Sequence, residues 1–273
     1  MIKRKINQYL QAWRRNPDHK PLVVRGARQV GKTFSIREFG KEYASFIEIN
    51  FITHPEFKDI FTHGYSVADV EKQITFIRPD CRFVSGDTLL FFDEMQEFPD
   101  CATCLKFFKE DGRYDVICSG SMMGLNYKDI TSNSVGYKTD YTMYSLDFEE
   151  FLWAKGYQPE QIDDLYRHLA TLTPFSMLEM DVMNELFLEY AVVGGMPAVV
   201  NRFIESGNYS GILDMQRQLL FDYEEDITKY AHGIDKARIK NVYRHIPFFL
   251  AKENKKFQIT KVAALLQVKI KTE

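Results

Sequence analysis

The stretch RGARQVGKTF, residues 25–34, decides the fold of this 273-residue chain. Within it, Gly26, Gly31, Lys32 and Thr33 satisfy the spacing G-x-x-x-x-G-K-[ST], which is typical of a loop that binds phosphate groups. Average residue usage would produce these fixed positions by chance in roughly one chain in a hundred. The flanking sequence therefore has to support the interpretation.

The residues around this stretch follow the order that a phosphate loop requires. The apolar run at 22–24 predicts a buried strand, and Phe34, Ile36 and Phe39 predict a helix directly after the loop. This order points backbone N–H groups and the positive end of the helix dipole at a phosphate. We therefore predict a nucleotide-binding loop made of Gly26, Ala27, Arg28, Gln29, Val30, Gly31, Lys32, Thr33 and Phe34.

Lys32 and Thr33 carry the chemistry of the predicted loop. Lys32 would reach the β- and γ-phosphates of a nucleotide, and the Thr33 hydroxyl would ligate Mg²⁺. The alternative for Lys32 is a solvent-exposed lysine at a helix start, where the helix dipole disfavours a cation unless an anion lies near. Because a lysine at a helix start is unfavourable without an anion, its presence here supports the phosphate-binding interpretation.

A second motif, TLLFFDE at residues 88–94, joins an apolar strand to two carboxylates. Asp93 would stand at the carboxyl end of this strand, the edge at which open α/β sheets bind their ligands, and would hold Mg²⁺ directly or through water. Glu94 is the candidate base that activates or orients the attacking water, or else a surface acid that begins a loop. Together with the phosphate loop, this motif predicts ATP hydrolysis.

The segment CSGS, residues 118–121, ends the next predicted strand and should lie beside the γ-phosphate. Ser119 or Ser121 could donate to that phosphate or to the lytic water. A Ser-Gly turn whose hydroxyls bond locally is the alternative for each serine. We take Lys32, Glu94 and Ser121 as the candidate catalytic residues.

Strands and helices alternate along the first half of the chain, which predicts an α/β fold with a mostly parallel sheet and helices on both faces. The expected strands lie near residues 22–24, 46–49, 89–92, 116–118 and 141–144. Beyond residue 147 the apolar patterns are helical, near 148–154, 161–172, 182–193, 198–205, 212–230 and 238–251. We predict an ATPase core at 1–155, a helical lid-like region at 156–232 and a basic segment at 233–273.

Charge is distributed unevenly along the chain. Residues 229–273 hold eleven Lys and Arg against three acids, a net charge of +8, whereas the whole chain carries −3, which leaves −11 for the preceding part. A basic end on an acidic body favours a polyanionic partner such as DNA. A solvated, lysine-rich helical face is the alternative.

The sequence also bears on whether the chain spans a membrane, is secreted or uses its cysteines to bind metal. No apolar run is long enough to span a bilayer, and the start MIKRKINQYL has no apolar signal-peptide core, so we expect a cytoplasmic chain without a membrane partner. Among the four cysteines, only Cys101 and Cys104 form a C-x-x-C pair. They are interpreted as two reduced thiols on a helix, with metal or redox use as the alternative.

Five segments in this order, RGARQVGKT, LLFFDEMQEFPD, ICSGS, TMYSLDFEEFLWA and VVGGMPAVV, strongly resemble a prokaryotic family of AAA-superfamily ATPases over most of residues 10–232. The resemblance implies an AAA-type (ASCE) P-loop core in which the strand bearing Cys118 lies between those bearing the phosphate loop and Asp93. It also implies a helical segment, a winged helix and a C-terminal domain similar to restriction-type nucleases.

The sequence departs from that family pattern in two ways. It stops at Glu273, before the nuclease-like region, so nuclease activity is not carried over and the chain is expected to be a fragment or a truncated member. Tyr137 and Ser145 stand where relatives tend to have Arg and Pro. This puts an arginine finger near 137 in doubt and leaves Arg202, with a helix-surface arginine as the alternative.

The expected function is Mg²⁺-dependent ATP hydrolysis coupled to a nucleic-acid-associated or remodelling role. The alternative is a nucleotide-dependent switch or protein-interaction module with slow hydrolysis. Guanine recognition usually needs an N-K-x-D segment, and residues 254–257 read N-K-K-F, so adenine is favoured. The expected partners are ATP, DNA, and a second copy or another protein.

The C-terminal sequence FQITKVAALLQVKIKTE, residues 257–273, predicts the front half of a helix-turn-helix or winged-helix unit. Val262, Ala263, Leu265 and Leu266 would form the buried face of a first helix, and residues 267–269 a tight turn before a second one. The alternative is a helix that packs on the core with its lysines in solvent.

Overall fold

The computed structural model describes residues 2–62, 64–121, 134, 136–230 and 234–251. The chain divides into two compact units, Met1–Ile212 and Leu213–Glu273, each described by itself. The boundaries predicted at residues 155 and 232 stay predictions.

The first unit is built on a five-stranded sheet in which all paired strands run parallel, in the order β2-β3-β4-β1-β5. Its strands are β1 (Leu22–Gly26), β2 (Ser45–Asn50), β3 (Thr88–Asp93), β4 (Asp115–Ser121) and β5 (Thr139–Met143). The predicted α/β fold is confirmed, and β4 lies between β1 and β3 as the resemblance implied. In register, Gly26 lies opposite Ser121, so β1 and the CSGS segment of β4 end at the same edge.

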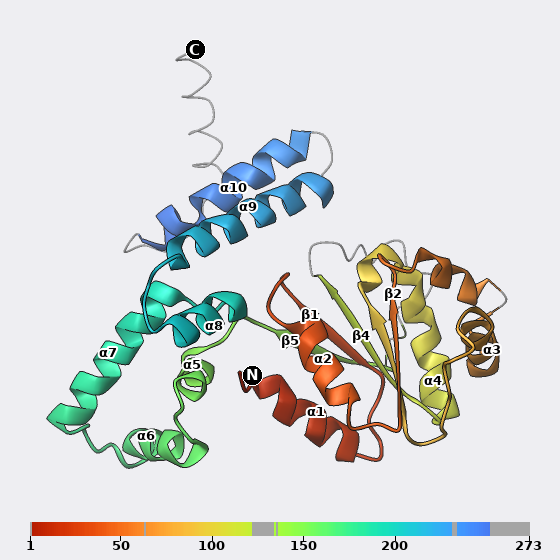
Figure 1. Ribbon diagram of the computed structural model, residues 1–273, viewed down its shortest axis with the longest axis horizontal. Coiled ribbons are helices and arrows are strands. Elements are labelled where there is room, and N and C mark those ends of the chain that lie inside the picture. Colours follow the sequence, from red (N-terminus) through yellow and green to blue (C-terminus); the bar gives the residue numbers. More distant parts are fainter. Residues whose placement is uncertain (1, 63, 122–133, 135, 231–233, 252–273) are drawn as a thin grey trace. The chain divides into compact units, whose positions relative to one another are not determined.

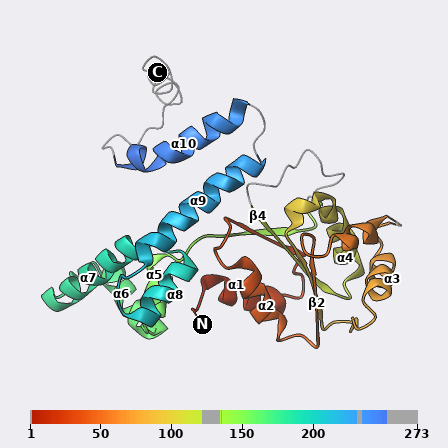
Figure 2. The same ribbon diagram turned by 45° about the horizontal axis from the view of Figure 1, so that its top comes forward.

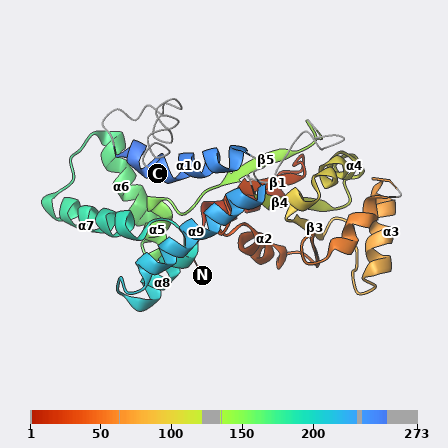
Figure 3. The same cartoon turned by 90° about the horizontal axis from the view of Figure 1, so that it is seen from above.

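Helices cover both faces of the sheet (Figure 1). Leu89 and Phe91 pack on one side, whereas Leu90 and Phe92 pack on the other, because successive side chains of a strand alternate. The first side is covered by α1 (Lys5–Arg15) and α2 (Lys32–Gly40), the second by α3 (Val67–Ile77) and α4 (Leu105–Asp111). Figure 3 shows α2 and α4 on the two sides of the sheet. A strand buried on both faces explains the unbroken apolar run of β3.

Short 3₁₀ helices connect these elements, at η1 (Pro55–Phe61), η2 (Met95–Glu97) and η3 (Pro99–Cys104). The sequence did not predict η1, whose Phe57, Ile60 and Phe61 are buried in the core beside α3. Cys101 and Cys104 are buried, free thiols, and burial raises the pKa of both. Both side chains therefore contribute to this core.

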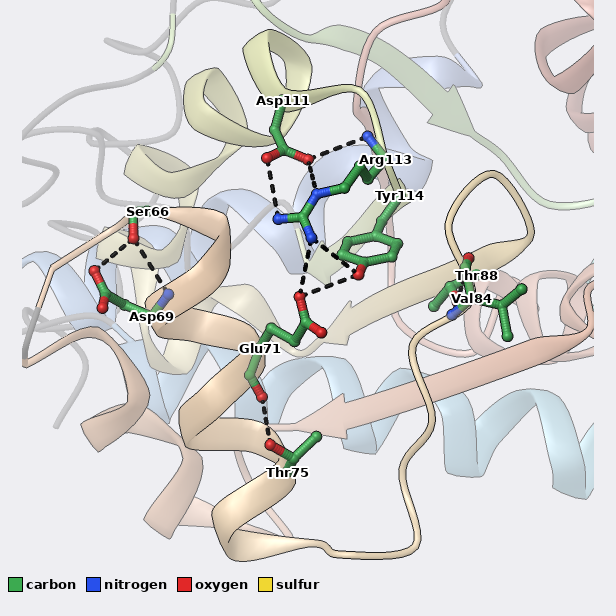
Figure 4. A network of polar contacts seen from close by, with 9 residues as sticks. All are labelled: Ser66, Asp69, Glu71, Thr75, Val84, Thr88, Asp111, Arg113 and Tyr114. Atoms are coloured by element: carbon green, nitrogen blue, oxygen red, sulfur yellow. Dashed lines mark hydrogen bonds and ion pairs between the residues drawn. The ribbon is translucent and has the colours of Figure 1, made fainter.

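Polar contacts lie at the amino ends of β3 and β4 (Figure 4). Arg113 pairs with Asp111 at 2.8 Å and with Glu71 of α3 at 3.4 Å, and the Tyr114 hydroxyl donates to Glu71 at 3.0 Å. The Thr88 hydroxyl donates to the carbonyl of Val84 at 3.0 Å. These contacts hold α3 against the residues just before β4, and they hold the loop before β3 against the first residue of that strand.

Four helices follow β5 within the first unit (Figure 2): α5 (Phe148–Ala154), α6 (Pro159–Thr171), α7 (Met177–Val193) and α8 (Pro197–Ser206). Helix α5 begins with a capping box in which Asp147 and Glu150 satisfy each other's backbone N–H groups. Glu150 also pairs with Arg4 at 3.0 Å, with both side chains buried. Arg4 in turn donates to the carbonyls of Val30 at 2.8 Å and Tyr144 at 2.7 Å. These bonds attach α5 to the loop between β1 and α2.

The second unit contains most of α9 (Ile212–Tyr230) and all of α10 (Ile234–Leu250). Arg244 of α10 donates twice to the Glu224 carboxylate of α9, at 2.7 Å each. The predicted partial winged helix at 257–273 and the N-K-K-F segment at 254–257 lie outside the described residues. Within the part of the chain that the structure describes, none of the helices combines the length and apolar character needed to cross a membrane.

Candidate functional site

Two glycines shape the loop between β1 and α2. A Cβ atom at Gly26 would lie 2.2 Å from the backbone oxygen of Met143 on β5, so the close approach of these strands requires glycine. Gly31 caps α2 with a φ of 97°, in the left-handed region that favours glycine. The loop therefore bends sharply, and Lys32 and Thr33 become the first residues of α2.

The ammonium group of Lys32 lies against the backbone of this loop. Its Nζ donates to the carbonyls of Gly26 at 3.1 Å and Ala27 at 2.7 Å. Burial lowers the pKa of Lys32, while the charges of Glu94 and Asp93 oppose that lowering. A partly desolvated ammonium at a helix N-terminus is a site that an anion would stabilise.

Asp93, at the end of β3, is 2% exposed and accepts hydrogen bonds from neutral donors. These donors are the Thr33 hydroxyl at 3.0 Å, the Asn50 amide at 3.2 Å, the backbone N–H of Glu94 at 3.0 Å and the Ser119 hydroxyl. Four donors suit an ionised carboxylate, which accepts only. The network fixes the Asp93 carboxylate against the Thr33 hydroxyl.

The contact of Thr33 with Asp93 fits a magnesium ion. Mg²⁺ prefers oxygen ligands and is usually bound by one or two protein groups together with phosphates and waters. Among the residues described, no group of three or more His, Cys, Asp or Glu could hold a metal. The Thr33 hydroxyl and the Asp93 carboxylate are both oxygen groups of the kind that Mg²⁺ prefers.

Glu94 and Ser121 are joined through Gln96. Glu94 has a left-handed backbone with a φ of 58°, which is uncommon for a residue other than glycine and is found at functional sites. The Gln96 amide donates to the Glu94 carboxylate and accepts from the backbone N–H of Ser121 at 3.0 Å. Ser119 instead faces Asp93, so the two serines of CSGS have different neighbours.

A cavity of about 550 Å³ opens at this edge of the sheet, a size suited to a nucleotide. It is lined by Arg28, Gln29, Gly31, Lys32, Thr33, Phe34, Arg37, Ile52, Glu94 and Ser121. The predicted loop residues Gly26, Ala27 and Val30 do not line it. Val30 is buried in the core beneath α2, so only its backbone is available to the loop.

Sequence reasoning missed Asn50, Gln96, Arg37 and Ile52. Asn50 ends β2 at the same edge as Asp93, so its position after a predicted strand was a usable signal. Gln96 follows the Asp-Glu pair, but its contact with Ser121 depends on the pairing of β3 with β4.

Neither of the two positions considered for an arginine finger lines this cavity. Arg202 is exposed on α8 and does not line the cavity. Tyr137 lies near Lys106, whose ammonium is 5.3 Å from the ring centroid. The arginine finger stays a prediction.

Comparison with known protein families finds similarity in two segments of the chain. Residues 18–152 match the family described as an AAA domain, and residues 184–272 match a domain of unknown function (DUF8612). No curated protein matches the sequence.

Solved structures show similarity at low sequence identity. The Walker-type ATPase of Pyrococcus abyssi is 15% identical, with 91% of this chain and 77% of that chain covered and a TM-score of 0.45. The Aeropyrum pernix ORC1 protein, solved in complex with DNA, is 11% identical over 98% and 82% of the chains, with a TM-score of 0.43. PCH-2 of C. elegans is 15% identical over 60% and 47%, with a TM-score of 0.36.

The residues matched by the AAA-domain family include those that form the parallel sheet. The matched residues include the phosphate loop, Asp93, Glu94 and CSGS, and they span all five strands of the parallel sheet. Residues 18–152 are therefore similar to an AAA domain, and they contain the whole of the parallel sheet.

Proposed function

We propose that this chain binds ATP together with Mg²⁺ and hydrolyses it. The observation that carries the proposal is the 3.0 Å contact between the Thr33 hydroxyl and the buried Asp93 carboxylate, with Thr33 lining the same cavity as Lys32 and Glu94. A cation, a hydroxyl and two carboxylates at the carboxyl edge of a parallel sheet form a set suited to phosphoryl transfer.

Each side chain has a distinct role in the proposal. Lys32 and the loop N–H groups would bind the β- and γ-phosphates, and Glu94 would accept a proton from the attacking water or orient it. Mg²⁺, held by Thr33 and Asp93, would neutralise charge on the phosphates when bound. Ser121, which lines the same cavity, would donate to the γ-phosphate or to that water.

The proposed ligand is an adenine nucleotide. Residues 254–257 lack the carboxylate of a guanine-binding N-K-x-D segment. Phe34 and Ile52, which are 54% and 48% exposed, offer apolar surface at the cavity that a flat base could cover. Competition between MgATP and MgGTP for the same site would test this preference.

Two substitutions separate binding from hydrolysis. Lys32→Ala should weaken MgATP binding by roughly tenfold to a hundredfold or more, because it removes a charged hydrogen-bond donor from the phosphates. Glu94→Gln should keep that affinity and slow turnover by roughly a hundredfold or more, the usual scale for a lost general base. Calorimetry measures the first effect, and phosphate release measures the second.

Lys41→Ala is the matched control, because Lys41 is exposed at the far end of the same helix. Its affinity and turnover should equal those of the wild type. Unchanged MgATP affinity in Lys32→Ala would remove that lysine from the phosphate site. Normal turnover in Glu94→Gln would assign water activation to another group.

The cellular role that we propose is a nucleic-acid-associated or remodelling one, supported by the +8 charge of residues 229–273. Turnover measured with and without duplex DNA, at low and moderate salt, tests this role. Strong, salt-sensitive stimulation is expected. A slow rate that DNA leaves unchanged would instead favour a nucleotide-dependent switch.

A further inference from the structure

Gln96 bridges the ends of two neighbouring strands. It lies in η2, directly after β3, and is 7% exposed. Its Nε2 donates to Oε2 of Glu94, and its Oε1 accepts from the backbone N–H of Ser121 at the end of β4. One buried amide thus connects the candidate base to a second strand of the sheet.

The orientation of this amide follows from its partners. A backbone N–H can only donate, so the Gln96 oxygen must face Ser121 and the Gln96 NH₂ group must face Glu94. Gln96 therefore acts on Glu94 as a donor. A flipped amide would place two donors against each other at Ser121.

The glycine of CSGS makes room for this arrangement. A Cβ atom at Gly120 would lie 2.9 Å from Gln96 Oε1 and 2.9 Å from Met95 Cγ, closer than real Cβ contacts. A side chain at position 120 would therefore push the Gln96 amide away from its partners.

We propose that Gln96 is a positioning residue that aims the Glu94 carboxylate at the attacking water. Gln96 engages Oε2, so Oε1 of Glu94 is the oxygen left to accept from a water. The backbone of Glu94 is held as well, by the bond from its N–H to Asp93. This inference rests on the proposed hydrolysis of ATP.

Gln96→Glu tests the proposal, because it exchanges an NH₂ group for an oxygen at constant shape. The new side chain can still accept from Ser121, but it removes the NH₂ donor and places a second carboxyl group against Glu94, where the two groups compete for a proton. We expect kcat to fall by roughly tenfold to a hundredfold, the scale seen for lost orienting partners. The KM for ATP and the Kd for MgATP should change less than about twofold, since only the reacting step loses an interaction.

A double-mutant cycle separates positioning from a structural role. In a Glu94→Gln background no carboxylate remains to be aimed, so adding Gln96→Glu should change kcat less than about twofold. Equal losses in both backgrounds would overturn the proposal. Gln8→Glu, which adds the same charge at an exposed site on α1, is the control and should behave as the wild type.

Gly120→Ala gives an independent variant with Gln96 intact. It should lower kcat without weakening MgATP binding, because the added methyl displaces the amide. The urea midpoint of each variant reports folding. The proposal would be wrong if Gln96→Glu lowered the urea midpoint, or if it reduced MgATP affinity by the same factor as kcat. Either result would mean that Gln96 has a structural role.

The outcomes also distinguish this inference from the proposed function. If the wild type shows no hydrolysis that Glu94→Gln suppresses, the proposed function fails. If the wild type does show such hydrolysis and Gln96→Glu has a normal kcat, only the role of Gln96 fails.

Discussion

Charged side chains have different kinds of partner at the two edges of the sheet. At the amino edge, carboxylates meet basic side chains directly: Asp115 lies 2.7 Å from His19, and Asp87 lies 2.9 Å from Arg14. At the carboxyl edge, Asp93 is surrounded by neutral donors, and Lys32 donates to two carbonyls. Within the described structure, no ion pair joins Lys32 to Asp93 or Glu94.

This difference separates structural charges from charges available to a ligand. A charge that is already paired gains little from a new partner, whereas a partly buried ammonium that forms no ion pair with a carboxylate gains from a phosphate. The carboxyl edge also carries the unusual backbone at Glu94, while the pairs at the amino edge join strand starts to α1 and to neighbouring loops. We therefore expect substitutions at the two edges to affect different measurements.

Asp93→Asn tests the carboxyl edge and should have the largest effect among the substitutions that compare the two edges. The amide lacks the charge that would hold a magnesium ion beside Thr33, so the affinity for MgATP should fall by roughly tenfold to a hundredfold. Affinity for ATP without Mg²⁺ should change much less. Calorimetry with and without Mg²⁺ measures both quantities. Equal losses in the two conditions would place the metal elsewhere.

Asp115→Asn is the matched variant at the amino edge, with a smaller effect on a different quantity. Asp115 accepts from the Tyr43 hydroxyl at 2.7 Å and pairs with His19, and the amide keeps the shape but loses the charge. The free energy of unfolding should fall by about 1–2 kcal/mol, as measured by urea denaturation. MgATP affinity should stay unchanged. A tenfold loss of affinity at unchanged stability would break the contrast between the edges.

Much of this organisation was predictable from the sequence. The unbroken apolar run of β3 indicated a strand buried on both faces, and the glycine spacing indicated a sharp loop before a helix. Thr33 and Asp93 were expected at one edge, and they lie in contact there, although their roles stay predictions.

The contacts of Gln96 were beyond sequence reasoning. They depend on a left-handed backbone at Glu94, a conformation that no local pattern of side chains indicates for a residue other than glycine. They also depend on a neighbour in β4 that is brought close only when β3 and β4 pair. Asn50 was missed for a related reason, because its partner Asp93 comes from the adjacent strand.

The smallest expected effect is a pH dependence of stability at the amino edge. The hydrogen bond to Asp115 raises the pKa of His19 above its usual value of 6.5, against the lowering by burial and by the charge of Lys109. A raised pKa in the folded state stabilises the fold fully below the unfolded pKa, and this stabilisation is lost as pH rises through the folded pKa. The difference in unfolding free energy between wild type and His19→Gln should therefore shrink as pH rises from about 5.5 to 9, by about 1 kcal/mol or less. In Asp115→Asn this dependence should be nearly absent, because the partner that raises the pKa is gone. A difference that grows with pH would mean that His19 is held neutral, and the amino edge would no longer be an edge of paired charges.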